Sequence, residues 1–177
     1  MDCNPELIAA AQNNTAKLGF SDRFALHTGE LADARFLENL RMEASPVQLV
    51  MANPPWRLVG SGRLPATEAR RKALFGDKGT FPLFASAASS LLEEDGRFVC
   101  IISPDRLQDM LAALDGAGLT PYLLQYIHKQ KTSPATFVLI EARKGAHAKP
   151  SVAEPIALYG QERFFTLESL AFCPFLR

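Results

Sequence analysis

The sequence predicts an α/β fold built around a mainly parallel sheet, and two observations lead to this prediction. Apolar segments of strand length alternate with helical segments along the chain, which is typical of a parallel sheet covered by helices. The last two predicted strands, residues 122–128 and 136–142, are joined by a link too short for a crossover, so they must be antiparallel. At 177 residues the chain can bury a substantial core, and we expect one domain over residues 1–177.

Capping residues and breaks in the apolar pattern place the individual elements. Asn4 can cap a helix that has Pro5 at its first position and is ended by Gly19. The apolar run 47–52 predicts a strand that stops at Asn53, because the two prolines that follow cannot continue a central strand. The elements expected up to residue 142 are helix 5–18, strand 23–27, helix 31–42, strand 47–52, helices 67–75 and 81–94, strand 97–103, helix 105–114 and strands 122–128 and 136–142.

Two segments are less regular than the rest. Residues 57–79 contain four glycines and many charges around the expected helix 67–75, and we interpret this long connection as a mobile functional loop. Residues 150–177 have no clear period. Their aromatic side chains are Tyr159, Phe164, Phe165, Phe172 and Phe175. We expect this C-terminal tail to pack on the domain.

Composition narrows the class of protein. The formal net charge is zero, so contact with nucleic acid would depend on local patches rather than on a global positive field. No apolar run approaches the ~20 residues of a membrane-spanning helix, and the N-terminus is not typical of a secretory signal. The histidines lack metal-ligand spacing, and the three cysteines lack CxxC spacing. We therefore expect a cytoplasmic protein with reduced, mostly buried thiols and no metal.

The segment with the most chemical content is Asn53-Pro54-Pro55-Trp56. The exocyclic amine of adenine is a poor nucleophile, and a site that accepts both of its N–H bonds helps the nitrogen become tetrahedral. The Asn53 side-chain oxygen and the Pro54 carbonyl can supply those acceptors, which the prolines hold in place. Trp56 offers a face on which a base can stack, a contribution of roughly 1–3 kcal/mol. The alternative is a rigid turn that only terminates the strand.

This segment resembles the Asp/Asn-Pro-Pro-aromatic motif of the S-adenosylmethionine-dependent N6-adenine and glutamine-N5 methyltransferases. The resemblance implies a Rossmann-like class I methyltransferase sheet with an antiparallel last strand. It also implies S-adenosylmethionine as the cofactor. The residues to which it assigns a catalytic role are Asn53, Pro54, Pro55 and Trp56.

Two further segments resemble the cofactor-binding parts of the family. Residues 2–7 are similar to the end of the family's second strand, where an acid binds the cofactor's ribose hydroxyls, a role that falls on Asp2. Gly29-Glu30-Leu31 resembles the segment after the third strand, where an acid meets the cofactor's adenine amine. Glu30 is one methylene longer than the family's aspartate. The resemblance assigns cofactor binding to Asp2, Cys3, Glu30, Leu31 and Asn53.

A finer resemblance is to bacterial tRNA N6-adenine methyltransferases that modify the adenine beside the anticodon of a valine tRNA. The similar segments are 60–71, 96–98, 103–104, 127–145 and 165–176. Trp56 stands where that family usually has tyrosine or another aromatic residue. Between residues 57 and 78 the chain has six basic residues and two acidic ones. The residues expected to contact tRNA phosphates are Arg57, Arg63, Arg70, Arg71, Lys129 and Lys131, with a merely solvated loop as the alternative.

The resemblance also implies elements that this sequence does not contain. The family's first strand lies between its second and fourth strands, and a glycine-rich turn after it holds the methionine end of the cofactor. No G-x-G-x-G occurs in the 177 residues. We therefore expect a strand–loop–helix unit of ~30 residues or more before Met1, and weak or no cofactor binding by the chain that starts there.

Two other functions stay open from the sequence. The same motif serves a planar amide, so the substrate can be a protein glutamine. The chain can also be a non-catalytic module that binds RNA or a partner, and the missing first strand favours this reading. The basic loop and the aromatic tail favour RNA over a glutamine-bearing protein.

Overall fold

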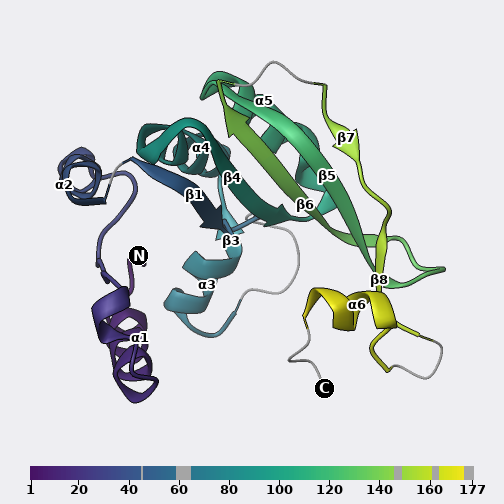
Figure 1. Ribbon diagram of the computed structural model, residues 1–177, viewed down its shortest axis with the longest axis horizontal. Coiled ribbons are helices and arrows are strands. Elements are labelled where there is room, and N and C mark those ends of the chain that lie inside the picture. The colour runs from purple at the N-terminus through teal and green to yellow at the C-terminus, as the bar shows by residue number, and fades with distance from the viewer. Residues whose placement is uncertain (45, 59–64, 146–148, 161–163, 174–177) are drawn as a thin grey trace. The chain divides into compact units, whose positions relative to one another are not determined.

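The computed structural model describes residues 1–44, 46–58, 65–145, 149–160 and 164–173 (Figure 1). The chain divides into two compact units, Met1–Ala44 and Ser45–Arg177, and each is described by itself.

The first unit is built around two helices. Helix α1 (Pro5–Lys17) begins where predicted, with the Asn4 side chain accepting a hydrogen bond from the Glu6 N–H at 2.9 Å. After a short 3₁₀ turn η1 (Ser21–Arg23), helix α2 (Ala34–Ala44) starts behind Asp33, whose Oδ1 accepts from the Arg35 N–H at 2.9 Å. Helix α2 begins three residues after its predicted start at residue 31, because the Asp33 side chain caps it.

The predicted strand at residues 23–27 is wrong. In its place the chain forms the turn η1 and an extended stretch, with a single parallel bridge between Asp2 and Thr28. The Asp2 N–H donates to the His27 carbonyl at 3.2 Å, and the Gly29 N–H donates to the Asp2 carbonyl at 3.1 Å. Because the pairing is limited to Asp2, no ladder forms.

The second unit contains the main sheet, in the order β1-β4-β6-β5-β7, with β8 also paired to β5. Strands β1 and β4 are parallel, and β6 runs antiparallel between β4 and β5 (Figure 1). This confirms the mainly parallel sheet with an antiparallel last strand. The bounds are β1 (Val47–Ala52), β4 (Leu92–Ile102), β5 (Leu119–Gln130), β6 (Ala135–Lys144), β7 (Ser151–Val152) and β8 (Ile156–Tyr159).

Two helices pack on this sheet and on each other, α4 (Thr80–Leu91) and α5 (Leu107–Gly116), the latter entered through a 3₁₀ turn η2 (Pro104–Arg106). The fully buried side chains between sheet and helices include Phe81, Phe98, Ile102, Met110, Leu114, Val138 and Ile140. Helix α4 is shorter than the predicted 81–94, because Leu92 already has extended dihedrals (φ −72°, ψ 141°) and begins β4. Within the described ranges, no helix is long and apolar enough to cross a bilayer.

The segment interpreted as a mobile loop has regular structure in its described part. Strand β2 (Arg57–Leu58) pairs in parallel with β3 (Phe75–Gly76), and helix α3 (Glu68–Leu74) leads into β3. The Thr67 side chain caps α3 by accepting from the Arg70 N–H at 3.4 Å. The chain therefore leaves the end of β1 through β2 and comes back beside the same place at β3.

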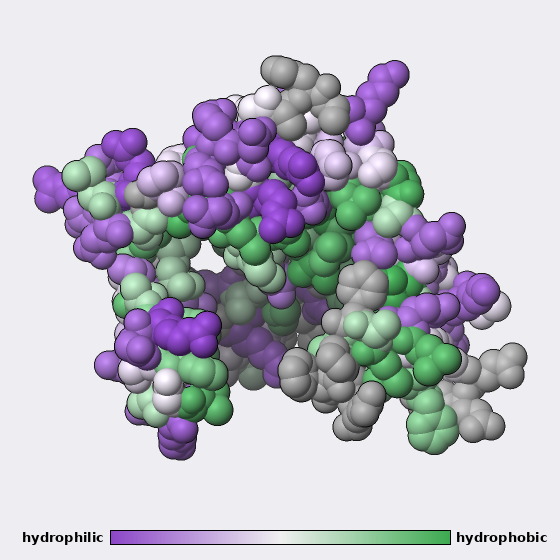
Figure 2. All heavy atoms as spheres, viewed as in Figure 1, coloured by the Kyte–Doolittle hydropathy of each residue, from purple (hydrophilic) through white to green (hydrophobic). Residues whose placement is uncertain are grey.

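The C-terminal tail extends the sheet, which the sequence did not reveal. Strands β7 and β8 both pair in parallel with β5, and helix α6 (Leu167–Phe172) packs on β8. The buried Ser169 hydroxyl donates to the Leu158 carbonyl at 3.0 Å, and the Tyr159 and Phe165 rings stack at 5.0 Å. Hydrophobic surface gathers over α6 and β8 (Figure 2). Phe164 and Leu167 are exposed.

The central strand gives a direct test of the fold. Ile140 is fully buried in β6 and is paired with Cys100 on one side and Leu124 on the other. We expect Ile140→Ala to lower the free energy of unfolding by about 2–5 kcal/mol, since it leaves a cavity between two neighbouring strands. Urea denaturation followed by circular dichroism measures this loss. Thr136→Ala, at an exposed position of the same strand, should cost less than about 1 kcal/mol. Equal losses would contradict the placement of β6 at the centre.

The cysteines give a second test. Cys100 is buried in β4, whereas Cys3 is exposed and Cys173 half-buried, so only Cys100 fits the expected burial. Burial raises the pKa of the Cys100 thiol from its usual 9.0 to about 12. The folded state therefore keeps a proton that the unfolded state loses, and this thiol's contribution to stability falls as the pH rises from about 9 toward 12.

In the native protein near neutral pH, iodoacetamide should modify Cys3 and leave Cys100 untouched until urea unfolds the chain. Peptide mass spectrometry at successive times measures both rates. Labelling of Cys100 in the native protein as fast as that of Cys3 would contradict its burial.

Candidate active site

The Asn53–Trp56 segment follows β1 at the carboxyl edge of the sheet. Ala52 pairs in parallel with Cys100 of β4, so Asn53 lies at the same edge as the residues that follow β4. Asn53 is exposed, and the Pro54 side chain is fully buried. In open α/β sheets ligands bind beyond the carboxyl ends of the strands, so the predicted catalytic residues lie where a ligand is expected.

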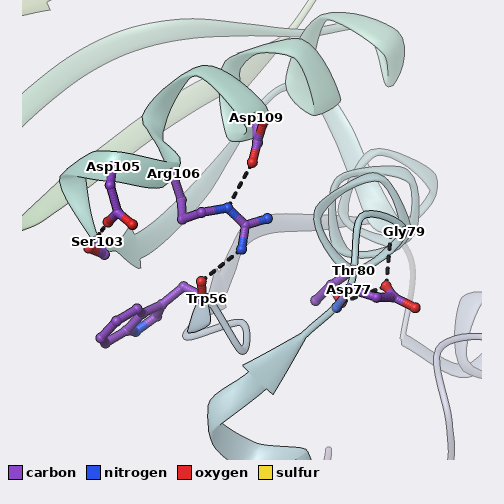
Figure 3. Close-up of polar contacts among 8 residues, drawn as sticks. All are labelled: Trp56, Asp77, Gly79, Thr80, Ser103, Asp105, Arg106 and Asp109. Atoms are coloured by element: carbon purple, nitrogen blue, oxygen red, sulfur yellow. Dashed lines mark hydrogen bonds and ion pairs between the residues drawn. The ribbon is translucent and has the colours of Figure 1, made fainter. Parts of the chain in front are cut away.

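A close backbone approach fixes Pro55. Gly76 of β3 is buried, and a Cβ built on it would lie 2.5 Å from the Pro55 carbonyl oxygen and 2.7 Å from the Thr80 hydroxyl. Both distances are too short for any side chain, so only glycine permits this contact. The Thr80 hydroxyl in turn accepts from the Asp77 N–H at 2.9 Å (Figure 3).

A buried arginine, Arg106, holds the backbone carbonyl of Trp56. The Arg106 side chain is 4% exposed, and its Nη1 donates to the Trp56 carbonyl at 2.8 Å while its Nε donates to Asp109 Oδ2 at 2.7 Å (Figure 3). Its guanidinium carbon lies 4.5 Å from the centre of the Phe81 ring. In the same loop, the Ser103 hydroxyl donates to the Asp105 carboxylate.

The Trp56 ring is half-buried and has two neighbours. The Phe137 ring meets it edge to face, with centroids 6.1 Å apart and planes at 75°. The Arg57 guanidinium carbon lies 5.2 Å from the Trp56 ring centre. Arg57 is exposed and can move aside, so a flat ligand can replace it on the ring.

The arrangement combines fixed hydrogen-bond acceptors with an aromatic face. An amide oxygen and a proline carbonyl accept hydrogen bonds and donate none, which suits a ligand that carries an amino group. The backbone around them is held before any ligand arrives, so binding costs little ordering of this segment.

In the first unit, the structure places two of the acidic residues assigned to the cofactor in one hydrogen-bonded region. Asp2 is half-buried and paired with Thr28, and Glu30 follows two residues later along the chain. Asp2 Oδ1 accepts from the Asn4 N–H at 2.8 Å, so the carboxylate is oriented by its own loop. Cys3 is exposed and Leu31 half-buried.

The basic residues expected to contact RNA lie in the second unit. Arg57 belongs to β2, Arg70 and Arg71 belong to α3, and Lys129 and Lys131 lie at the turn from β5 to β6; all five are exposed. Arg63 lies outside the described residues. Since β5 runs parallel to β1, its carboxyl end and the two lysines are at the same edge as Asn53.

The described residues contain no group of three or more His, Cys, Asp or Glu side chains that can hold a metal ion.

Sequence reasoning missed the residues that surround the Asn53–Trp56 segment. Gly76, Arg106 and Phe137 come from three different elements, and Arg106 is 50 residues from the carbonyl that it contacts. The spacing of Arg106 and Asp109 predicts a helical ion pair, but such pairs are ordinary on exposed helices. No residue near Arg106 in the sequence indicates that this arginine is buried.

Comparison with known proteins identifies solved structures that have a similar fold. No protein-family model and no curated protein matches the chain. Among solved structures, a predicted O-methyltransferase from Agrobacterium tumefaciens superposes with a TM-score of 0.72 at 18% identity, covering 98% of this chain and 73% of its own.

Two nucleic-acid-related structures are also similar. A protein from Clostridium thermocellum described as an rRNA methylase has a TM-score of 0.51 at 20% identity, over 80% of this chain and 72% of its own. A modification subunit described for a type I restriction enzyme from Vibrio vulnificus has a TM-score of 0.52 at 13% identity, over 92% of this chain and 37% of its own. At these identities the likeness concerns the fold: the chain has the Rossmann-like α/β fold of methyltransferases.

Proposed function

We propose that this protein transfers a methyl group from S-adenosylmethionine to the exocyclic N6 of an adenine in tRNA. The observation that carries the proposal is the position of Asn53-Pro54-Pro55-Trp56, at the carboxyl edge of a methyltransferase-type sheet with its backbone held on three sides. A turn that only ended a strand would need neither the Gly76 contact nor the buried Arg106.

Asn53 and Pro54 would bind the amino group of the base. The Asn53 side-chain oxygen and the Pro54 carbonyl accept its two N–H bonds, which directs the nitrogen lone pair away from the ring plane. When bound, S-adenosylmethionine supplies an electrophilic methyl group on a sulfonium. The methyl group would exchange its bond to sulfur for one to this nitrogen, and the amino group would release one proton to solvent, so the transfer would need no covalent link to the protein.

Trp56 would hold the base by stacking. Its ring is steadied by the Phe137 edge, and Arg57 occupies the place that a base would take. The base has to leave its own stack to reach this ring, and the bases of a tRNA loop do so at lower cost than those of a duplex.

Asp2 and Glu30 fit the binding of an adenosyl group. A carboxylate accepts hydrogen bonds through two oxygens, which suits the paired hydroxyls of a ribose, and Asp2 is oriented by the Asn4 N–H. Glu30 follows the Gly29 N–H that is bonded to Asp2, so both acids would face one ligand. Cys3 and Leu31 flank these acids along the chain and would contact the same ligand.

The choice of RNA as substrate rests on charge and on the tail. Exposed Lys129 and Lys131 lie at the same sheet edge as Asn53. The Tyr159–Phe165 stack adjoins them, since Tyr159 pairs with Gln130 at the end of β5. Cations beside aromatic rings are the usual means of binding unpaired nucleotides. Arg57, Arg63, Arg70 and Arg71 would add phosphate contacts.

The function is tested by measuring transfer of labelled methyl from S-adenosylmethionine to bulk tRNA, and by identifying N6-methyladenine in the digested product. A parallel reaction contains a protein with an exposed glutamine. Methylation of the protein alone would replace adenine by glutamine as the substrate, and transfer to neither would refute the proposal.

Substituting Asn53 tests the acceptor role. We expect Asn53→Ala to reduce methyl transfer by about 10²–10³-fold, the range for removing one preorganised polar group. Asn53→Asp keeps an acceptor oxygen and should retain far more activity. Exposed Gln12 on α1 provides a control, since Gln12→Ala should transfer at the original rate. Equal activity of Asn53→Ala and the unsubstituted protein would exclude Asn53 from the chemistry.

Salt dependence tests the two lysines. Each phosphate contact contributes close to one unit to the slope of log affinity against log salt concentration. The double substitution Lys129→Ala with Lys131→Ala should therefore weaken tRNA binding and lower that slope by about two. Fluorescence anisotropy of labelled tRNA at several salt concentrations measures it. The matched control is Lys17→Ala with Lys149→Ala, two exposed lysines that are not among the residues expected to contact tRNA, and an equal change there would indicate a general charge effect.

A further inference from the structure

Arg106 is a buried cation with three partners. Its guanidinium contacts the Asp109 carboxylate, the Phe81 ring and the Trp56 carbonyl, at the distances given above. A buried charge is costly unless it is paired and hydrogen-bonded, and the carboxylate and the ring together meet that need from the helices next to it. The third partner is different, because it belongs to the segment after β1.

The Asn53–Trp56 backbone is held at more than one point. Pro54 and Pro55 have fixed φ angles, and the Pro55 carbonyl is packed against Gly76. The hydrogen bond from Arg106 Nη1 adds a hold on the plane of the peptide after Trp56. A charge-assisted hydrogen bond is well suited to this task, being shorter and stronger than one between neutral groups.

The same hydrogen bond links two loops of the sheet edge. Arg106 ends the turn η2 directly after β4, and Trp56 follows the neighbouring strand β1. Figure 3 shows the guanidinium directed from the start of α5 toward the Trp56 carbonyl, with Asp109 on the same helix behind it. Moving Arg106 would therefore move the peptide that leads out of the motif.

We propose that Arg106 is a positioning residue, which fixes the Trp56 peptide and through it the direction of the ring. Its effect on the ring rests on the hydrogen bond to the Trp56 carbonyl, whereas its effect on a substrate rests on the proposed function. Arg106 does not touch the reacting atoms. Asp109 orients the guanidinium and supplies its counter-charge, so removing that carboxylate would leave the buried Arg106 cation unpaired.

Trp56 is the single tryptophan of the chain, so its fluorescence reports on this ring without a label. Arg106→Lys keeps the charge but cannot serve Trp56 and Asp109 together, because an ammonium lacks the planar fork of a guanidinium. Arg106→Met keeps the length and removes the donors. In both variants we expect easier quenching of Trp56 by acrylamide and lower anisotropy, with a population of displaced ring conformers raised roughly tenfold.

A control separates positioning from general loosening. Exposed Gln108→Ala alters the same helix and leaves the partners of the guanidinium in place, so it should keep the original quenching and anisotropy. Folded Arg106 variants, judged by circular dichroism, whose Trp56 signals equal those of the unsubstituted protein would overturn the proposal.

Kinetic measurements test the effect of Arg106 on a substrate, which depends on the proposed function. If the protein methylates tRNA, Arg106→Lys should lower kcat by about tenfold to a hundredfold with little change in KM for the cofactor, as expected when a stacked base is misplaced. An unchanged kcat in that variant would overturn the link to substrate. If the unsubstituted protein transfers no methyl group, the proposed function fails while the fluorescence comparison still decides the positioning role.

A measurement on the unsubstituted protein covers the case in which neither variant folds. Labelling arginine with ¹⁵N and the tryptophan carbonyl with ¹³C should give resolved, slowly exchanging Nη protons for Arg106, with a coupling across the hydrogen bond to the Trp56 carbonyl carbon. Observation of that coupling supports the proposal. Free rotation of the guanidinium would overturn it.

Discussion

The architecture depends on the insertion of β6 between β4 and β5. This strand runs against both neighbours and pairs with each along most of its length, and its Val138, Ile140 and Ala142 side chains are fully buried. Because β6 is antiparallel to both, β4 and β5 point the same way, and β1 follows β4. The carboxyl ends of three strands therefore lie at one edge, which is shared by Asn53, Ser103 and the two lysines at the end of β5.

At that edge, rigidity comes from contacts that cross the chain. Pro54 is anchored by burial, Pro55 by Gly76, the Trp56 carbonyl by Arg106 and the Trp56 ring by Phe137. Each contact uses a different kind of force: apolar burial, close backbone approach, a charged hydrogen bond and an aromatic pair. Asn53 is the exposed residue at the head of this fixed segment, so the polar group that meets a ligand is presented by a backbone that is already ordered.

The sequence predicted the elements that local chemistry determines. The strand 47–52 has the bounds predicted for it, because an apolar run met two prolines, and the start of α1 followed from Asn4 and Pro5. The sequence prediction failed where a residue far away along the chain determines the local structure, as at the strand predicted for residues 23–27. The apolar pattern of β1 is typical of a strand covered on both faces, yet Leu49 and Met51 are 40% and 73% exposed, since they lie on the face opposite Val50 and Ala52, which pack on the core. The burial of Arg106 was equally invisible. The roles of the predicted site residues remain predictions.

The parallel pair of β2 and β3 has a consequence for how such a protein can change. Leu58 pairs with Gly76, so the chain departs from the sheet edge and re-enters it at one place. Residues between those points can vary in length or be exchanged as a block without altering the anchors on either side, because loop closure costs little more for a longer segment. Selectivity can thus diversify in an exchangeable insert, while the chemistry next to it stays under strict geometric constraint.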